Sequence, residues 1–158
     1  MKPYLSFKKF YQDINSIELL IDASNGRFSG ETRIYISSDG NKLTDLGNNL
    51  IGFPKTFQQK IDFEMGFSGD KIQPDPFVKF NTAYFQIIFS NSDRLGHLAA
   101  QLVIREGTRR SSDKSGAECK FEICFEPNQL DIFVNDLLKL AAGLKDEAIL
   151  HCLEQNEF

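Results

Sequence analysis

The chain has 158 residues, of which 41% are hydrophobic and 25% charged, and its formal net charge is −4. These values are typical of one soluble domain with its own core, and we expect a single domain over residues 1–158. They argue against direct nucleic-acid binding, because phosphate recognition needs a concentrated basic surface. No apolar run approaches the roughly 18 residues of a membrane helix and no apolar signal core is present, so we expect a cytoplasmic protein that binds no membrane.

The three cysteines are Cys119, Cys124 and Cys152. Cys119 and Cys124 stand five residues apart in a predicted strand, so their side chains should point to opposite faces. A disulfide between them is therefore disfavoured, and we expect reduced cysteines in a reducing compartment.

Residues 1–15 have an ambiguous pattern. One face of a helix could carry Tyr4, Phe7, Tyr11 and Ile14. An irregular arm could equally be anchored by Leu5 and Phe10 together with Tyr4 and Phe7. We expect an N-terminal arm or a short helix that lies on the rest of the domain.

A β-hairpin is predicted over residues 16–37. Its inward positions are Ile17, Leu19 and Ile21 on the first strand and Phe28, Thr32, Ile34 and Ile36 on the second. Asn25-Gly26 indicates the turn, because a tight hairpin turn needs positive φ at its centre. Gly30 falls on the inward face, where it leaves room for a bulge or for a neighbouring side chain.

A short helix and a series of strands follow. Leu43, Leu46 and Leu50 have helical spacing, with Ile51 at the margin, in a helix that Gly47 weakens and that ends before Pro54. Alternation then predicts strands over residues 57–65, 77–90 and 97–105. Turn-forming or polar residues separate them at 66–76, 91–96 and 106–117.

The clearest pattern lies between Glu118 and Gly143. Cys119, Phe121, Ile123 and Phe125 alternate with mostly charged residues, as in a strand with one dry face. The spacing then becomes helical, with apolar residues at Leu130, Phe133, Val134, Leu137, Leu138 and Ala141. Pro127 suits the first helical position, and Gly143 can take the left-handed conformation that ends a helix. For residues 147–153 we favour a final strand over a helical tail.

These elements predict an α+β fold. Hairpin connections imply antiparallel pairing, and amphipathic helices need an apolar surface to cover. We therefore expect a single antiparallel sheet of about six to seven strands, hairpin plus meander, with two helices packed on one face.

Catalytic chemistry is not visible in the sequence. His97 is followed by no nucleophile motif, and residues 66–69 lack the rest of a phosphate-binding loop. The candidate zinc ligands Cys119, Cys124, His151 and Cys152 include a pair that faces apart. We predict a non-catalytic protein with no cofactor and no metal.

Exposed carboxylates are the best candidates for contacts with a partner. Alternation puts Asp62 and Glu64 on one side of one strand, and Glu118 and Glu122 on one side of another. The predicted partner-binding residues are Glu31, Asp62, Glu64, Glu118, Glu122, Asp131 and Asp136. Each could simply face water, or could meet a basic protein.

Four segments of the sequence form a recognisable series: GRFSGETRIYIS (26–37), the GFP that follows the short helix (52–54), LGHLAAQLVIRE (95–106), and CKFEICFEPNQLDIFVNDLLKLAAG with the later EAIL (119–150). In these segments and their order the chain resembles WapI-type bacterial immunity proteins. These are structural motifs without a catalytic set. The arm before residue 16 and the insert at 66–80 have no counterpart in the pattern.

Membership of that family would imply a protein that neutralises a cognate toxin by covering one of its surfaces. An acidic surface would suit a basic nuclease domain, through electrostatic steering and fast association. The alternative is a small-molecule-binding or regulatory domain, with a phenylalanine-lined pocket between sheet and helices. A toxic product of a neighbouring gene would favour the first interpretation, and a ligand that raises thermal stability the second.

Overall fold

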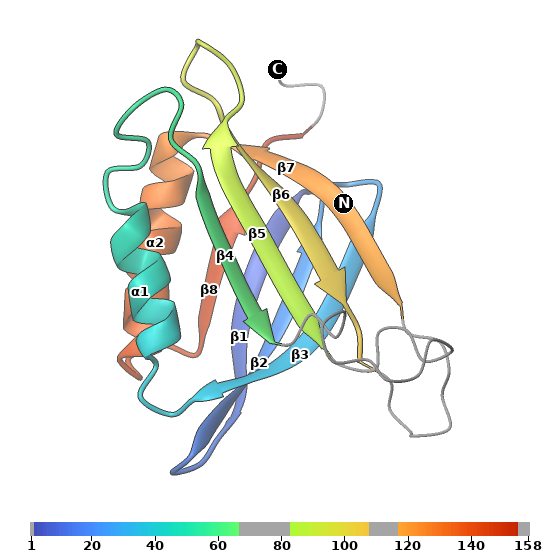
Figure 1. Cartoon of the computed structure of the whole chain (residues 1–158), viewed down its shortest axis with the longest axis vertical. Coiled ribbons are helices and arrows are strands. Elements are labelled where there is room, and N and C mark those ends of the chain that lie inside the picture. Colours follow the sequence, from blue (N-terminus) through green and yellow to red (C-terminus); the bar gives the residue numbers. More distant parts are fainter. Residues whose placement is uncertain (1, 67–82, 108–116, 155–158) are drawn as a thin grey trace.

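This computed structural model describes residues 2–66, 83–107 and 117–154. Within these ranges the chain forms two antiparallel sheets of four strands each and two helices (Figure 1). The first sheet has the order β3-β2-β1-β8, formed by β1 (Tyr4–Gln12), β2 (Ser16–Ser24), β3 (Ser29–Ser37) and β8 (Glu147–His151). The second has the order β4-β5-β6-β7, formed by β4 (Ile61–Gly66), β5 (Tyr84–Asn91), β6 (Leu98–Arg105) and β7 (Glu118–Phe125). The helices are α1 (Asn41–Leu50) and α2 (Pro127–Ala141).

The α+β class and the antiparallel pairing are confirmed, but the prediction of a single sheet is wrong. Each sheet has one apolar face, and two such faces can be buried against each other as well as beneath helices. Alternation within a hairpin is the same in both arrangements. It therefore cannot reveal whether the next hairpin extends the first sheet or begins a second one.

Strand β3 joins the two sheets. The Thr32 hydroxyl donates to the main-chain carbonyl of Arg105 across the interface, at 2.8 Å. Gly30 lies so close to Cys119 that a Cβ at this position would overlap the sulfur. The β2–β3 register passes through Ala23 and Gly30 without a shift. Of the two explanations for this glycine, a neighbouring side chain is therefore the correct one.

The N-terminal segment is a strand, and the prediction of an arm or short helix is wrong. β1 lies inside the first sheet, between β2 and β8. Its register with β2 shifts between Lys9 and Tyr11, which leaves Phe10 in a bulge. The bulge interrupts the alternation that would have identified the strand. The second partner, β8, is contributed by the other end of the chain: the Ser6 hydroxyl donates to Glu147 at 3.0 Å.

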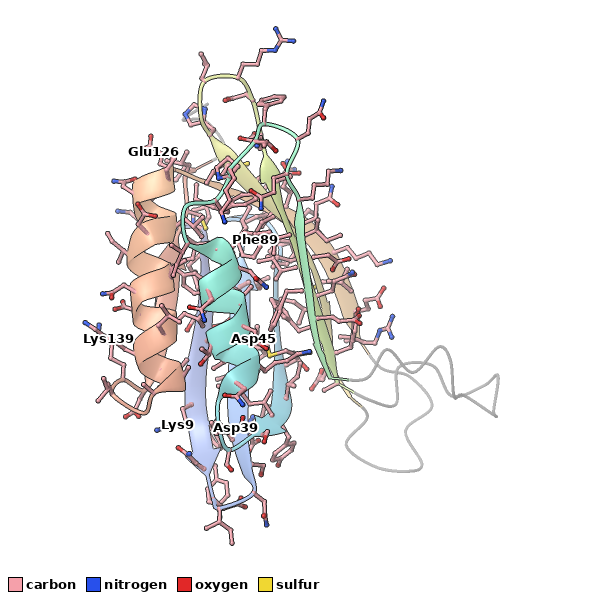
Figure 2. All side chains as sticks on the ribbon, turned by 60° about the vertical axis from the view of Figure 1, so that its left-hand side comes forward. Lys9, Asp39, Asp45, Phe89, Glu126 and Lys139 are labelled. Carbon is pink, nitrogen blue, oxygen red and sulfur yellow. The ribbon has the colours of Figure 1, made fainter. Side chains whose placement is uncertain are left out.

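The helix predicted from the change in spacing is confirmed as α2. Glu126 and Gln129 form a capping box at its start, Pro127 follows the cap, and Gly143 has a φ of 77° beyond its end. The helix lies against β8 and α1 lies against α2, at the side of the sandwich where β8 and β4 are the edge strands (Figures 1 and 2). The helices thus cover an open side of the sandwich, and not one face of a sheet as predicted.

The core is built where both sheets and α2 meet. Phe7 of β1 packs edge to face on Phe85 of β5 and on Phe133 of α2, with ring centroids 5.5 and 5.8 Å apart. Figure 2 shows Phe89 pointing into the interior, with Lys139 on the outer side of α2. Gly47 lets the helices approach, since a Cβ there would lie 2.6 Å from a methyl carbon of Leu138.

Several predicted boundaries shift. The strand expected from residue 57 begins at Ile61, and Phe57 is exposed. Ile51 is exposed beyond the end of α1. The final strand is confirmed as β8. Most of the 66–80 insert lies outside the described residues, as does the loop at 108–116.

Candidate functional site

The outer face of the second sheet gathers four of the seven predicted partner-binding residues. Strand register places them in rows that run across all four strands. One row is Glu64, Gln86, Val103 and Lys120, and the next is Asp62, Ile88, Gln101 and Glu122. A third contains Tyr84, Arg105 and Glu118. Asp62 on β4 is thus about 14 Å from Glu122 on β7, which is three strand spacings of ~4.8 Å.

Hydrogen bonds connect the β4 carboxylates to β5. The Gln86 amide donates to Asp62 at 3.0 Å, and the Tyr84 hydroxyl donates to Glu64 at 2.6 Å. Burial and this bond to Glu64 raise the pKa of Tyr84 well above its ordinary value, so the hydroxyl remains a donor at neutral pH. These hydrogen bonds hold the two carboxylates in place without a cationic partner.

At the β7 edge, charge is largely compensated. Arg105 is only 7% exposed, and its Nε donates to Glu118 at 2.7 Å. Its guanidinium carbon also lies 5.3 Å from the centroid of the Tyr84 ring. Lys120 approaches the other oxygen of Glu118 at 3.5 Å. Glu118, predicted to contact a partner, thus belongs to a structural cluster of the sheet.

Three carboxylates of this face have no cationic partner among the described residues. Asp62, Glu64 and Glu122 are exposed, and their hydrogen-bond donors are neutral: Gln86, Tyr84 and Cys124. Within the described residues, none of the three forms an ion pair. We call Asp62, Glu64 and Glu122 the acidic face. Its charge is available to a cationic partner.

The other three predicted residues lie elsewhere. Glu31 is on the outer face of the first sheet, opposite Asp22 of β2 in the strand register. Asp131 and Asp136 are on α2, and Asp136 accepts an ion pair from Lys145 at 2.8 Å. The structure therefore divides the predicted set among three surfaces.

Sequence reasoning missed an aromatic cluster on the outer face of the first sheet. It consists of Phe10, Tyr11 and Tyr35, all more than half exposed. Tyr11 and Tyr35 flank Glu18 in the strand register. The Arg33 guanidinium lies 4.2 Å from the Phe10 ring centroid. The sequence pattern that points to this cluster is the aromatic content of residues 4–11. These side chains can be assigned to a face only once the segment is known to be the strand β1.

His97 and the three cysteines have local structural roles. His97 Nδ1 lies 2.6 Å from Asp93 in the turn between β5 and β6, and this hydrogen bond lowers the pKa of Asp93. Cys119 faces the interior and Cys124 the outer side, as predicted. Burial raises the pKa of Cys124 to about 11 and that of Cys152 to about 12, so both remain thiols at neutral pH.

No protein-family model matches the chain, and neither a curated protein nor a solved structure matches it significantly. None of the helices in the described ranges is long and apolar enough to cross a bilayer. Among the same residues, no three His, Cys, Asp or Glu side chains come together as metal ligands would.

Proposed function

We propose that the protein is a cytoplasmic bacterial immunity protein of the WapI type, which neutralises a cognate toxin by binding it directly. The observation that carries this proposal is the acidic face, whose three carboxylates are exposed and without a cationic partner among the described residues. The resemblance of the strand and helix motifs to that family supports it. A toxin with a basic surface, such as a nuclease domain, is the partner whose charge fits.

The binding mode follows from the shape of the surface. The face is a four-stranded sheet whose polar side chains, among them Gln86 and Gln101, lie between Asp62 and Glu64 on β4 and Glu122 on β7. Such a surface can cover the active site of another protein without any movement of its own. Its charge would increase the rate of association with a basic partner, and that rate would fall as salt is added.

The test begins with the neighbouring genes. Each of their products is expressed in a host cell with and without this protein, and growth is measured. We expect one product to be toxic alone and harmless when this protein is co-expressed. The same pair is then purified, and its association rate is measured at increasing ionic strength.

The assignment of the surface is tested by charge reversal. The triple variant Asp62→Lys, Glu64→Lys, Glu122→Lys should lose protection and should associate at least about tenfold more slowly, because electrostatic steering accelerates association by this factor or more. All three positions are exposed, so the fold should persist. Circular dichroism checks this.

A matched control changes the net charge equally at other surfaces. Glu31→Lys, Asp45→Lys and Asp131→Lys together reverse three exposed carboxylates away from the acidic face. This variant should still protect. Equal loss in both triple variants would show that only net charge matters and would remove the assignment of the face. Neighbouring products that are all harmless would contradict the function itself.

A further inference from the structure

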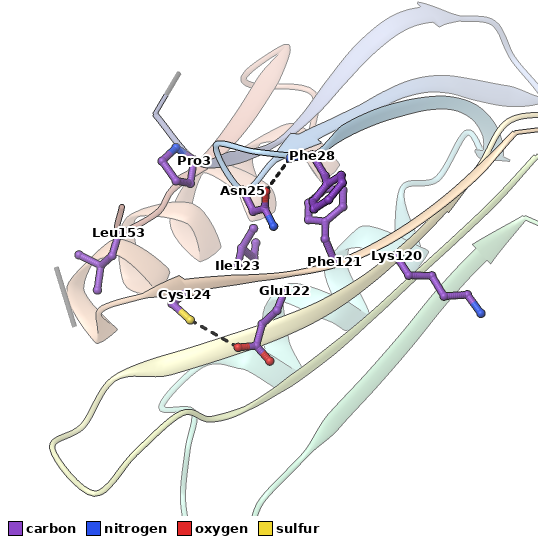
Figure 3. Close-up of a pocket in the computed structure, with 9 residues that line it drawn as sticks. All are labelled: Pro3, Asn25, Phe28, Lys120, Phe121, Glu122, Ile123, Cys124 and Leu153. Atoms are coloured by element: carbon purple, nitrogen blue, oxygen red, sulfur yellow. Dashed lines mark hydrogen bonds between the residues drawn. The ribbon is translucent and has the colours of Figure 1, made fainter. Parts of the chain in front are cut away.

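An open groove runs along β7 on the side away from β6. It has a volume of about 460 Å³. Its walls include Phe28 and Asn25 of the β2–β3 turn, Phe121 and Ile123 of β7, and Pro3 and Leu153 at the two chain ends (Figure 3). Figure 3 shows the β2–β3 turn on one side of the groove and β7 on the other. This groove contains no residue of the aromatic cluster and shares only Glu122 with the acidic face.

The main chain of β7 faces this groove. β7 is an edge strand, hydrogen-bonded to β6 alone within the sheet. On the β6 side, the carbonyl of Ala117 accepts a bond from Glu106 N at 2.8 Å. On the groove side, the carbonyl of Cys124 accepts a bond from Leu153 N, also at 2.8 Å. Since direction alternates along a strand, the N–H and C=O groups of Lys120 and Glu122 also point into the groove.

These groups lack a partner in the part of the chain that is described. No hydrogen bond from the described residues engages the main chain of Lys120 or Glu122 on the groove side. The bond between Leu153 and Cys124 shows that the edge accepts an added chain at its upper end. An extended peptide that continued from there would complete the same ladder.

The side chains around the edge define what this peptide would look like. On the inner side, the exposed ring of Phe28 presents apolar surface across from the nearly buried Phe121 and Ile123, so every second residue of the peptide should be apolar. On the outer side, Lys120 and Glu122 are exposed. The residues opposite them should be acidic and basic, respectively, because cross-strand pairs of opposite charge stabilise a ladder.

A second copy of this chain would not satisfy the groove. Its β7 could pair with the edge, but Phe121 and Ile123 are already 9% and 1% exposed inside their own core. The copy would therefore bring no apolar side chain from this strand into the groove. A separate segment with free apolar residues can fill it.

We propose that the β7 edge is a peptide-binding site, which takes an extended segment of a partner protein as a fifth strand of the second sheet. The segment alternates apolar residues, which enter the groove, with a basic and an acidic residue opposite Glu122 and Lys120. This site does not require the proposed function, since any partner with such a segment could occupy it, although Glu122 belongs to both surfaces.

The probe is the capped peptide Thr-Val-Lys-Val-Glu-Val-Thr. In the antiparallel direction its lysine falls opposite Glu122 and its glutamate opposite Lys120, while its valines face the groove. Binding is measured by isothermal titration calorimetry with the full chain. In ¹⁵N spectra, the amides of Lys120 and Glu122 should show the largest shifts.

Two N-methylated peptides separate strand addition from other binding modes. Methyl groups on the amides of the lysine and glutamate block the bonds to β7 and should weaken binding at least about tenfold. Methyl groups on the amides of the two flanking valines point away from β7 and should leave affinity within about threefold. Equal affinity for the two peptides would overturn strand addition.

Protein variants test the two halves of the site. Glu122→Pro removes one N–H that points into the groove and leaves the hydrogen bonds between β7 and β6 intact. Edge strands tolerate proline at positions whose N–H points away from the sheet. Phe28→Ser removes an apolar wall whose side chain is 61% exposed, and Phe57→Ser is its control, 57% exposed and outside the groove. Glu122→Pro and Phe28→Ser should each lower the affinity for the peptide about tenfold, and Phe57→Ser should leave the affinity unchanged.

Failure of the peptide to bind at up to about 1 mM would overturn the proposal. So would concentration-dependent dimerisation of the wild-type chain that Glu122→Pro abolishes, because the occupant would then be a second copy. A failure in these experiments leaves the toxin-protection test unaffected, since protection is measured by growth in co-expression and does not require a peptide at β7.

Discussion

The contact between the two sheets at Gly30 and Cys119 can be tested by enlarging the first residue and shortening the second. Gly30 lies in a regular part of β3, so alanine is compatible with its backbone, yet the added Cβ would overlap the Cys119 sulfur. We expect Gly30→Ala to destabilise the protein, because the added methyl overpacks the contact between β3 and β7.

The magnitude follows from two opposing terms. Overpacking a core contact costs about 1–3 kcal/mol. Replacing glycine by alanine in a strand returns about 0.5–1 kcal/mol of backbone entropy. The net loss in the free energy of unfolding should therefore lie between about 0 and 2.5 kcal/mol. In a Cys119→Ala background the sulfur is gone, and the next atoms, Cβ and Cγ2 of Ile104, would lie 3.7 Å from the new methyl, at ordinary contact distance. There Gly30→Ala should be stabilising.

The assay is urea unfolding of the wild type, both single variants and the double variant. Far-ultraviolet circular dichroism is the suitable signal, because the chain contains no tryptophan. The coupling energy between the two sites should be about 1–3 kcal/mol, favouring the exchanged pair. A Gly30→Ala effect of the same size in both backgrounds would show that Cys119 is not what requires the glycine, and would refute the sheet contact.

Three further results are expected. Glu118→Gln should lower the free energy of unfolding by about 1.5–3 kcal/mol, measured by urea unfolding, because it replaces the charged acceptor of the buried Arg105 guanidinium. Burial and the hydrogen bond to Asp22 raise the pKa of Tyr4 to about 12, and burial and Glu64 raise that of Tyr84 further. Both hydroxyls are protonated more readily when folded, so the stability they give is complete below the unfolded pKa of 10.0 and is lost as pH rises through the folded values. Urea unfolding and ultraviolet difference absorbance should show this loss, together with delayed tyrosine ionisation, from pH 10 upward; ionisation of all tyrosines in one step at the ordinary pKa would contradict it. Cys152 should react with iodoacetamide far more slowly in the native protein than in urea, because burial raises its thiol pKa to about 12, and equal rates would contradict its burial.

The candidate site was predictable in part. Alternation alone placed Asp62 with Glu64, and Glu118 with Glu122, on the wet sides of their strands. That the two pairs share one face depends on β5 and β6 between them, and that Glu118 is compensated depends on Arg105. The sequence gives the number of carboxylates, whereas the ion pairs formed in the folded protein decide which of them can contact a cationic partner.

The groove and the aromatic cluster were not predictable in the same way. Both depend on β1, whose alternation is broken by the bulge at Phe10 and whose partner β8 begins at Glu147. No local pattern links residues so distant. Phe28 was expected in the core, and only the position of the β2–β3 turn beside β7 places it on the wall of a groove.

The sequence by itself determined the elements that depend on neighbouring residues. The β2–β3 hairpin, the strand from Glu118 and the helix from Pro127 all follow from spacing, turn residues and capping, which act within a few positions. Only the tertiary structure decided that the strands divide into two sheets, that β1 pairs with β8, and that β7 is an edge strand among the described residues. An apolar strand face requires burial but does not specify its partner, and that choice is made by the packing of the whole chain.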